Sequence, residues 1–244
     1  LGFVQVVVSL DAAQNEIHDQ RRRRQGVCEA AKRAIREMID RPLQYRTVVT
    51  SVDRSNFAEL EAIRDWLLQY GQGVTWMINY TSPVEGSRMS RELAFSEKDF
   101  AQLAQFIAQN RVSLKDRLNV TGTHGMGYFS TTYDDLHDHQ WSGCQAGLTT
   151  LGILSDGDVN GCLIMGHRLV EGNLRERSLR DVWDDPKAFA YNRHFTPNQL
   201  TGKCKDCIHG VQCRGGCRQI ALSYTGGLYE APFCLHRMEQ KGQP

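Results

Sequence analysis

Apolar and polar residues are grouped in blocks along the first 110 residues, and these blocks predict strands followed by helices. Residues 3–10 are rich in valine, and two more short apolar runs occupy residues 45–52 and 74–80. Such runs are typical of strands buried on both faces of a sheet. Residues 27–39 instead carry apolar side chains at every third or fourth position, as an amphipathic helix does. We expect an α/β fold whose parallel strands are joined by right-handed crossovers.

Capping signals predict two more helices in this part of the chain. Asn56 precedes an apolar-periodic segment, and Glu59 follows at the spacing of a capping box. Ser96 precedes a second such segment, with Phe100 on its inner face. We interpret the basic run 21–24 as a solvated loop. Because three strand–helix units leave an unpaired sheet edge, we expect further strands before residue 1.

The pattern changes after residue 118. Residues 119–140 are rich in glycine and polar side chains, which favours a linker between a first domain, 1–118, and a second, 141–244. In the second domain, apolar segments on both sides of Ser155-Asp156-Gly157-Asp158 predict a β-hairpin.

Composition and charge describe an ordinary globular protein. The 244 residues are 41% hydrophobic and 23% charged, and the net charge is +1. So small a charge gives no electrostatic reason to expect a nucleic-acid partner. The longest apolar run is too short to span a bilayer, so we expect no membrane partner. A regular α/β pattern with a single cysteine in its first 140 residues does not suit a secreted disulfide scaffold, and we expect reduced thiols and a cytoplasmic location.

Cysteines crowd toward the C-terminus at short spacings. Five of the eight follow the pattern Cys204-x2-Cys207-x5-Cys213-x3-Cys217-x16-Cys234, and Cys144 and Cys162 lie upstream. Grouped thiolates at such spacings are the ligands of iron–sulfur clusters and structural zinc. The remaining Cys28 lies alone on the predicted helix 27–39, which favours a buried core thiol.

Together with their flanking sequences, these seven cysteines resemble the SPASM domain, a C-terminal extension of many radical SAM enzymes. The matching segments are CQAG, SDGDVNGC, GNLRERSLRDVWDDP, CRGGC and PFCLHR. The resemblance covers about residues 140–240. It implies a small cysteine-rich domain with a β-hairpin, a helix and two auxiliary [4Fe–4S] clusters.

The N-terminal part is similar to the barrel of the same enzymes. VSLDAAQNEIHDQRR resembles the family's SLDG…HD…RG strand and loop, although Ala12 stands where the family usually has glycine. TVVTSVDRSNFAELEAI resembles the next strand–helix unit. The resemblance implies that residues 1–118 are the C-terminal half of a partial, TIM-like (β/α)6 barrel. It also implies that Ser9 and Asp11, at the end of a barrel strand, bind S-adenosylmethionine.

Radical SAM enzymes hold their catalytic [4Fe–4S] cluster with Cys-x3-Cys-x2-Cys, and this spacing does not occur in the sequence. Three missing strand–helix units correspond to about 100 residues. We therefore expect the motif in the intact parent protein and expect this chain alone to be inactive in cleaving S-adenosylmethionine.

The resemblance also implies which thiolates hold which auxiliary cluster. The distal cluster would be held by Cys204, Cys207, Cys213 and Cys234, and the proximal cluster by Cys144, Cys162 and Cys217. Seven thiolates leave one iron without a protein ligand. His137, Asp138 or His139 could fill that position, or it could stay open to substrate, and the alternative is that these three are solvated linker residues.

We expect an oxidoreductase that modifies a peptide or protein by 5′-deoxyadenosyl-radical hydrogen abstraction, with a small redox protein as electron partner. Sulfatase maturation is disfavoured, since that branch of the family has Asp directly after the equivalent of Cys162, where this chain has Leu163. Two alternatives remain: a non-catalytic zinc-binding module and an electron-transfer module.

Overall fold

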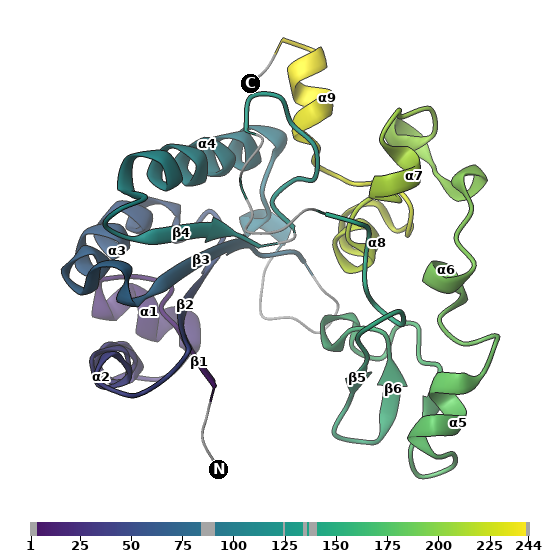
Figure 1. Ribbon diagram of the computed structural model, residues 1–244, viewed down its shortest axis with the longest axis horizontal. Coiled ribbons are helices and arrows are strands. Elements are labelled where there is room, and N and C mark those ends of the chain that lie inside the picture. The colour runs from purple at the N-terminus through teal and green to yellow at the C-terminus, as the bar shows by residue number, and fades with distance from the viewer. Residues whose placement is uncertain (1–3, 84–90, 124, 134–135, 137–140, 243–244) are drawn as a thin grey trace. The chain divides into compact units, whose positions relative to one another are not determined.

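The protein is described by a computed structural model that covers residues 4–83, 91–123, 125–133, 136 and 141–242. The chain forms two compact units. One comprises residues 1–81, 90–139 and 235–244, and the other comprises residues 82–89 and 140–234. Figure 1 shows the elements of each unit along the chain.

Helices and strands alternate in the first unit and are short in the second. The strands are β1 (Gln5–Ser9), β2 (Tyr45–Val52), β3 (Thr75–Tyr80), β4 (Asn119–Gly122), β5 (Gly152–Ile153), β6 (Asp158–Asn160) and β7 (Gly172–Asn173). The α-helices are α1 (Asn15–Arg22), α2 (Val27–Ile39), α3 (Leu60–Leu67), α4 (Glu97–Leu114), α5 (Leu179–Asp184), α6 (Ala190–Arg193), α7 (Gly210–Cys213), α8 (Arg218–Thr225) and α9 (Leu235–Gln240).

The first unit is built on a four-stranded parallel sheet in the order β1-β2-β3-β4. In the middle of the sheet, Val48 pairs with Val8 on one side and with Trp76 on the other. The predicted α/β fold with a parallel sheet is confirmed.

One face of this sheet packs against helices. Trp76 and Tyr80 point to this face, and their rings lie 6.0 Å from Phe106 and 5.3 Å from Phe100, both on α4. The predicted cap of α4 is confirmed, because the Ser96 side chain accepts a hydrogen bond from the backbone of Asp99 in a capping box. This packing supplies the apolar core of the unit.

The opposite face of the sheet is polar. Thr47, Ser51, Asn79 and Thr121 lie on it in neighbouring registers. The side-chain oxygen of Asn79 is buried and makes no hydrogen bond to any described residue. A polar sheet face with an unused acceptor is suited to binding a polar molecule rather than to core packing.

The sequence-based boundary between the domains needs two corrections. Residues 119–122, expected at the start of a linker, form β4 because Val120 and Thr121 pair with the exposed edge of β3. Helix α9 belongs to the first unit rather than the second. Its Glu239 carboxylate accepts hydrogen bonds from the backbone amides of Thr131 and Thr132, each at 3.0 Å.

Two local predictions near β1 are wrong for a shared reason. Asn56 makes no helix cap, because its amide donates to the carbonyl of Asp11 at 2.7 Å. Glu59 is turned to the same loop and accepts the backbone amides of Ala13 and Gln14, each at 3.1 Å. These side chains hold the loop after β1 instead of capping a helix.

The basic run is likewise not a loop throughout, since Arg21 and Arg22 end α1. Arg21 pairs with Asp53 at 2.7 Å and Arg22 pairs with Asp11 at 2.7 Å. Because both carboxylates are buried, they draw the two arginines onto the sheet edge.

The second unit contains the predicted β-hairpin, with β5 antiparallel to β6 and β7 added beside β6. Gly157 makes the turn with φ of +94°, which favours glycine. Within the described ranges, the chain has no helix that is both long and apolar enough to cross a membrane.

Candidate metal centres

All eight cysteines lie in the described part of the chain, and each is a thiol rather than half of a disulfide. Cys28 is fully buried in the first unit, which confirms it as a core thiol. The other seven all belong to the second unit. Electrostatic contacts among these seven divide them into two sets.

Cys144, Cys162 and Cys217, here called the hairpin set, influence one another directly. A hydrogen bond between the thiols of Cys144 and Cys217 lowers the pKa of Cys144 far below that of an ordinary thiol and raises the pKa of Cys217. Burial raises the pKa of Cys162, and the negative charge of Cys144 adds to that effect. The three thiols therefore lie close enough together that Cys144 affects the pKa of each of the other two.

Cys204, Cys207, Cys213 and Cys234 form the second group, here called the loop set. Burial raises the pKa of Cys213 to about 12, and the charges of Cys234, Cys204 and Cys207 contribute. Thiols that repel one another's charges need a cation to be stable together as thiolates, which is the role of metal or cluster iron.

Short helical turns place these thiols. Cys204 ends the 3₁₀ turn Gly202–Cys204, Cys213 ends α7, and Cys217 precedes the first residue of α8. Between the last two, Gly215 has φ of +76°, and a Cβ there would lie 2.5 Å from the backbone of Tyr229. The absence of a side chain at Gly215 therefore lets its backbone lie against the backbone of Tyr229.

Hydrogen-bond donors point at the hairpin set. The backbone amides of Arg218 and Ala146 and the side chain of Asn192 all lower the pKa of Cys144. Cys217, which directly precedes α8, accepts hydrogen bonds from the backbone amides of Ile220 and Gln219. Donors to thiolate sulfur stabilise negative charge and tune a bound cluster.

The spacing of the thiols bears on which metal they suit. A single zinc ion holds thiolates about 2.3 Å away, so its sulfurs lie about 3.8 Å apart. Among the described residues, only Asp156, Asp158 and His167 offer three ligand atoms within 4.8 Å of one another. Both cysteine sets are wider than that, which favours a polynuclear cluster over one zinc ion.

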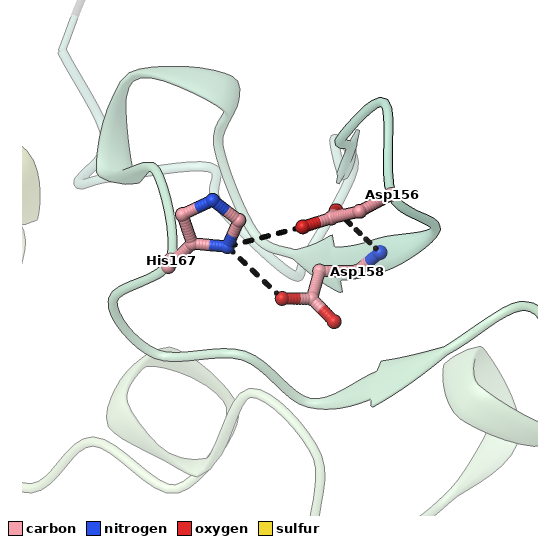
Figure 2. A group of neighbouring side chains, drawn as sticks. All are labelled: Asp156, Asp158 and His167. Carbon is pink, nitrogen blue, oxygen red and sulfur yellow. Dashed lines mark hydrogen bonds and ion pairs between the residues drawn. The ribbon is translucent and has the colours of Figure 1, made fainter.

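The Asp156–Asp158–His167 group lies at the turn of the hairpin (Figure 2). The Nδ1 atom of His167 is 3.1 Å from an Asp158 oxygen and 3.6 Å from an Asp156 oxygen. The hydrogen bond to Asp158 raises the pKa of His167. These partly exposed side chains satisfy one another as an ion pair, and we assign them no metal.

Ser9 and Asp11 belong to the other unit. Ser9 ends β1, and Asp11 follows two residues later with 4% of its surface exposed. One Asp11 oxygen accepts the amide of Ser51 at 3.0 Å, and the other pairs with Arg22. Both oxygens thus have partners in the protein, so Asp11 shapes this edge of the sheet.

His137, Asp138 and His139 lie outside the described residues. The sequence reasoning missed three residues around the hairpin set: Tyr191, Asn192 and Arg218. Their spacing in the sequence gives no signal. The only available clue is that Arg218 directly follows the predicted ligand Cys217.

Comparison with known proteins identifies the cysteine-rich region. Residues 144–208 match SPASM, an iron–sulfur cluster-binding domain. An AdoMet-dependent heme synthase of Methanosarcina barkeri is 25% identical to this chain, covering 98% of the chain and 70% of that protein. The mycofactocin maturase MftC of Mycobacterium tuberculosis is 28% identical, covering 94% of the chain and 56% of that protein.

Solved structures show the same fold. Streptococcus suis SuiB bound to S-adenosylmethionine superposes with a TM-score of 0.63 at 17% identity, covering 94% of this chain and 52% of that one. The enzyme anSMEcpe with bound AdoMet and a peptide gives 0.57 at 17% identity, covering 97% and 65%.

The chain therefore spans about half to 70% of the length of these proteins. Its α/β unit, its cysteine-rich unit and its relatives lead to one conclusion: the chain is a radical SAM/SPASM protein.

Proposed function

We propose that this chain is the C-terminal part of a radical SAM/SPASM enzyme that modifies a peptide or protein, with two auxiliary [4Fe–4S] clusters. The observation that carries the proposal is the division of seven cysteines into two neighbouring sets in one unit. The maturase MftC and the peptide-bound anSMEcpe support a peptide as the substrate class.

The loop set would hold the distal cluster with four thiolates. The hairpin set would hold the proximal cluster with three, which leaves one iron position for another residue or for substrate. The residues fit such groups, because two buried donor atoms that no described residue satisfies lie beside the hairpin set, one on Tyr191 and one on Arg218. The clusters would supply one-electron uptake or release beside the substrate.

The first unit would form half of a partial barrel around the reaction centre. Its polar sheet face, with the unsatisfied oxygen of Asn79, would face the barrel interior. Ser9, at the carboxyl end of β1, would contact S-adenosylmethionine, while Asp11 and Arg22 hold the adjoining loop. When bound, S-adenosylmethionine and a catalytic cluster elsewhere in the parent would supply the 5′-deoxyadenosyl radical for hydrogen abstraction.

A tetrapyrrole is the second candidate substrate. The heme synthase of Methanosarcina barkeri aligns with 98% of this chain. The protein expressed from its whole reading frame decides between the two classes. Incubated anaerobically with S-adenosylmethionine and a reductant, it should change the mass of a peptide encoded beside it and leave a ferric porphyrin carboxylate unchanged, and the reverse result would establish the tetrapyrrole class.

Metal content tests the clusters themselves. After anaerobic reconstitution we expect about eight iron and eight sulfide per chain, which corresponds to two [4Fe–4S] clusters. Cys144→Ala and Cys204→Ala should each lose about half of this iron, because each removes one ligand from one set. Cys28→Ala is the matched control and should retain all of it.

Stoichiometric zinc without sulfide would overturn the proposal and leave a zinc-binding module. Clusters that load fully in a parent protein without Cys-x3-Cys-x2-Cys would instead leave an electron-transfer module. For a radical SAM enzyme that acts on either substrate class, a small cytoplasmic redox protein would be the electron partner.

A further inference from the structure

Two buried polar atoms in the second unit have no hydrogen-bond partner among the described residues. They are the hydroxyl oxygen of Tyr191 and the Nη2 atom of Arg218. Buried donors without a partner are destabilising, so such atoms in a folded protein call for an explanation. Both atoms lie beside the hairpin set, and this location suggests what they are for.

Tyr191 faces the segment that carries Cys162. Its side chain is 8% exposed, and a Cβ placed on Gly161 would lie 2.0 Å from the hydroxyl oxygen. The hydroxyl is therefore packed against the backbone just before Cys162. The charges that act on it are, in order, those of Glu171, Cys144 and Cys162. The hydroxyl is buried, lies next to the hairpin set, and makes no hydrogen bond to the side chain of any described residue.

Arg218 follows Cys217 directly and is completely buried. Its Nε donates to Asn192 at 2.9 Å, and its Nη1 donates to the carbonyl of Leu228 at 2.9 Å. The guanidinium lies 4.5 Å from the ring centroid of Tyr229. Within the part of the chain that the structure describes, no carboxylate forms an ion pair with it.

A buried cation needs an anion nearby. Arg218 follows Cys217 in the chain and donates to Asn192, whose neighbour Tyr191 packs against the backbone before Cys162. The backbone amide of Arg218 also donates to the Cys144 sulfur. The guanidinium is therefore balanced by the thiolates of the hairpin set and by whatever those thiolates bind.

We propose that Tyr191 and Arg218 are dedicated to the cluster of the hairpin set: the Tyr191 hydroxyl donates a hydrogen bond to a cluster sulfur, and the Arg218 guanidinium balances the cluster's negative charge. This inference rests on the proposed function, because it requires a cluster on these thiols. Both groups stabilise the more negative, reduced form, so they raise the reduction potential of this cluster.

The loop set shows no such arrangement. Among the described residues, the remaining buried side-chain atoms that lack a hydrogen bond all belong to the first unit. Loss of the Tyr191 or Arg218 group should therefore lower the potential of the hairpin cluster alone. Each of the two clusters takes up one electron from an external donor, and no bond breaks.

A redox titration followed by electron paramagnetic resonance tests the inference. With dithionite as electron donor, the two auxiliary clusters of the reconstituted protein should each give a reduction step, and of these two the step retained in Cys204→Ala belongs to the hairpin set. Tyr191→Phe removes only the hydroxyl and should shift that step to lower potential without changing the loop step. Arg218→Lys should shift it less than Arg218→Met.

Tyr229→Phe is the matched control, since its hydroxyl already accepts from Gln199 and donates to the Tyr191 carbonyl. It should leave both steps unchanged. If Tyr191→Phe binds a full complement of iron and its hairpin step does not move, the inference is overturned, whatever becomes of the Arg218 variants. A wild-type protein that binds no iron would overturn the proposed function instead.

Discussion

The two cysteine sets use the same chemistry in different surroundings. In the hairpin set, Cys144 and Cys217 are each 7% exposed. All four thiols of the loop set are partly exposed, and the intervening Ile208 and Val211 are 81% and 68% exposed. Two of the three hairpin thiols are thus buried, with Cys162 partly exposed, whereas none of the four loop thiols is buried.

This difference indicates a division of labour. The loop thiols are partly open to water, which solvates part of the charge that they carry. Cys144 and Cys217 are shielded from water, and the protein supplies compensating groups beside them through Asn192, Tyr191 and Arg218. Buried donors beside Cys144 and Cys217 suit control of the potential of a bound cluster.

The largest expected difference between the two sets is the rate at which they lose iron to a chelator. Under anaerobic chelation of the reconstituted protein, we expect about half of the iron to leave quickly and half slowly, since the loop set is closer to solvent. The absorbance of a ferrous chelate follows the release. Cys204→Ala should lack the fast phase and Cys144→Ala the slow one, and a single phase shared by all three proteins would contradict the comparison.

The sequence was sufficient to predict the elements that carry strong periodicity. Residues 27–39 form α2 as expected, since their apolar spacing matches a buried helical face. The strand at 45–52 forms β2 for the corresponding reason. In contrast, β4 has four residues, only one of them a large apolar side chain, and exists because the edge of β3 pairs with it. Helix α1 is mostly polar and is held by Asp53 and Asp11.

The candidate site divides in the same way. Short cysteine spacings pointed to a metal site near the C-terminus, because thiolate ligation demands particular residues at short separations, and the resemblance to SPASM domains implied all seven ligand candidates. It could not reveal Tyr191 or Arg218. A tyrosine or an arginine is ordinarily exposed or hydrogen-bonded, and only tertiary packing shows that these two are buried with an unused donor.

A single methyl group at Gly161 should damage the hairpin set and spare the loop set. A Cβ there would lie 2.0 Å from the Tyr191 hydroxyl and 2.9 Å from Ala146. Such overpacking destabilises by about 1–3 kcal/mol. Chemical denaturation of Gly161→Ala should show this loss, together with a smaller slow phase of iron release.

Gly227→Ala provides the control, because the nearest atom to its Cβ would be 3.7 Å away. Adding Tyr191→Phe to Gly161→Ala should recover part of the stability, since it removes the oxygen in closest conflict. No recovery in the double variant would mean that the clash with Ala146 decides the outcome and that Tyr191 is less tightly packed than the structure indicates.

The smallest expected effect is a pH dependence confined to the hairpin. Because Asp158 raises the pKa of His167 above its ordinary value of about 6.5, their ion pair stabilises the fold fully below that pH. The contribution is lost as the pH rises through the folded-state pKa. Nuclear magnetic resonance titration should show a lower pKa of His167 in Asp158→Asn than in the wild type. The denaturation midpoints of the wild type and of Asp158→Asn should converge toward pH 8.

An unchanged His167 titration in Asp158→Asn would show that the pair does not persist in solution. A fast phase of iron release that followed this pH change would show that the loop set is coupled to the hairpin, against the separation drawn between the two sets.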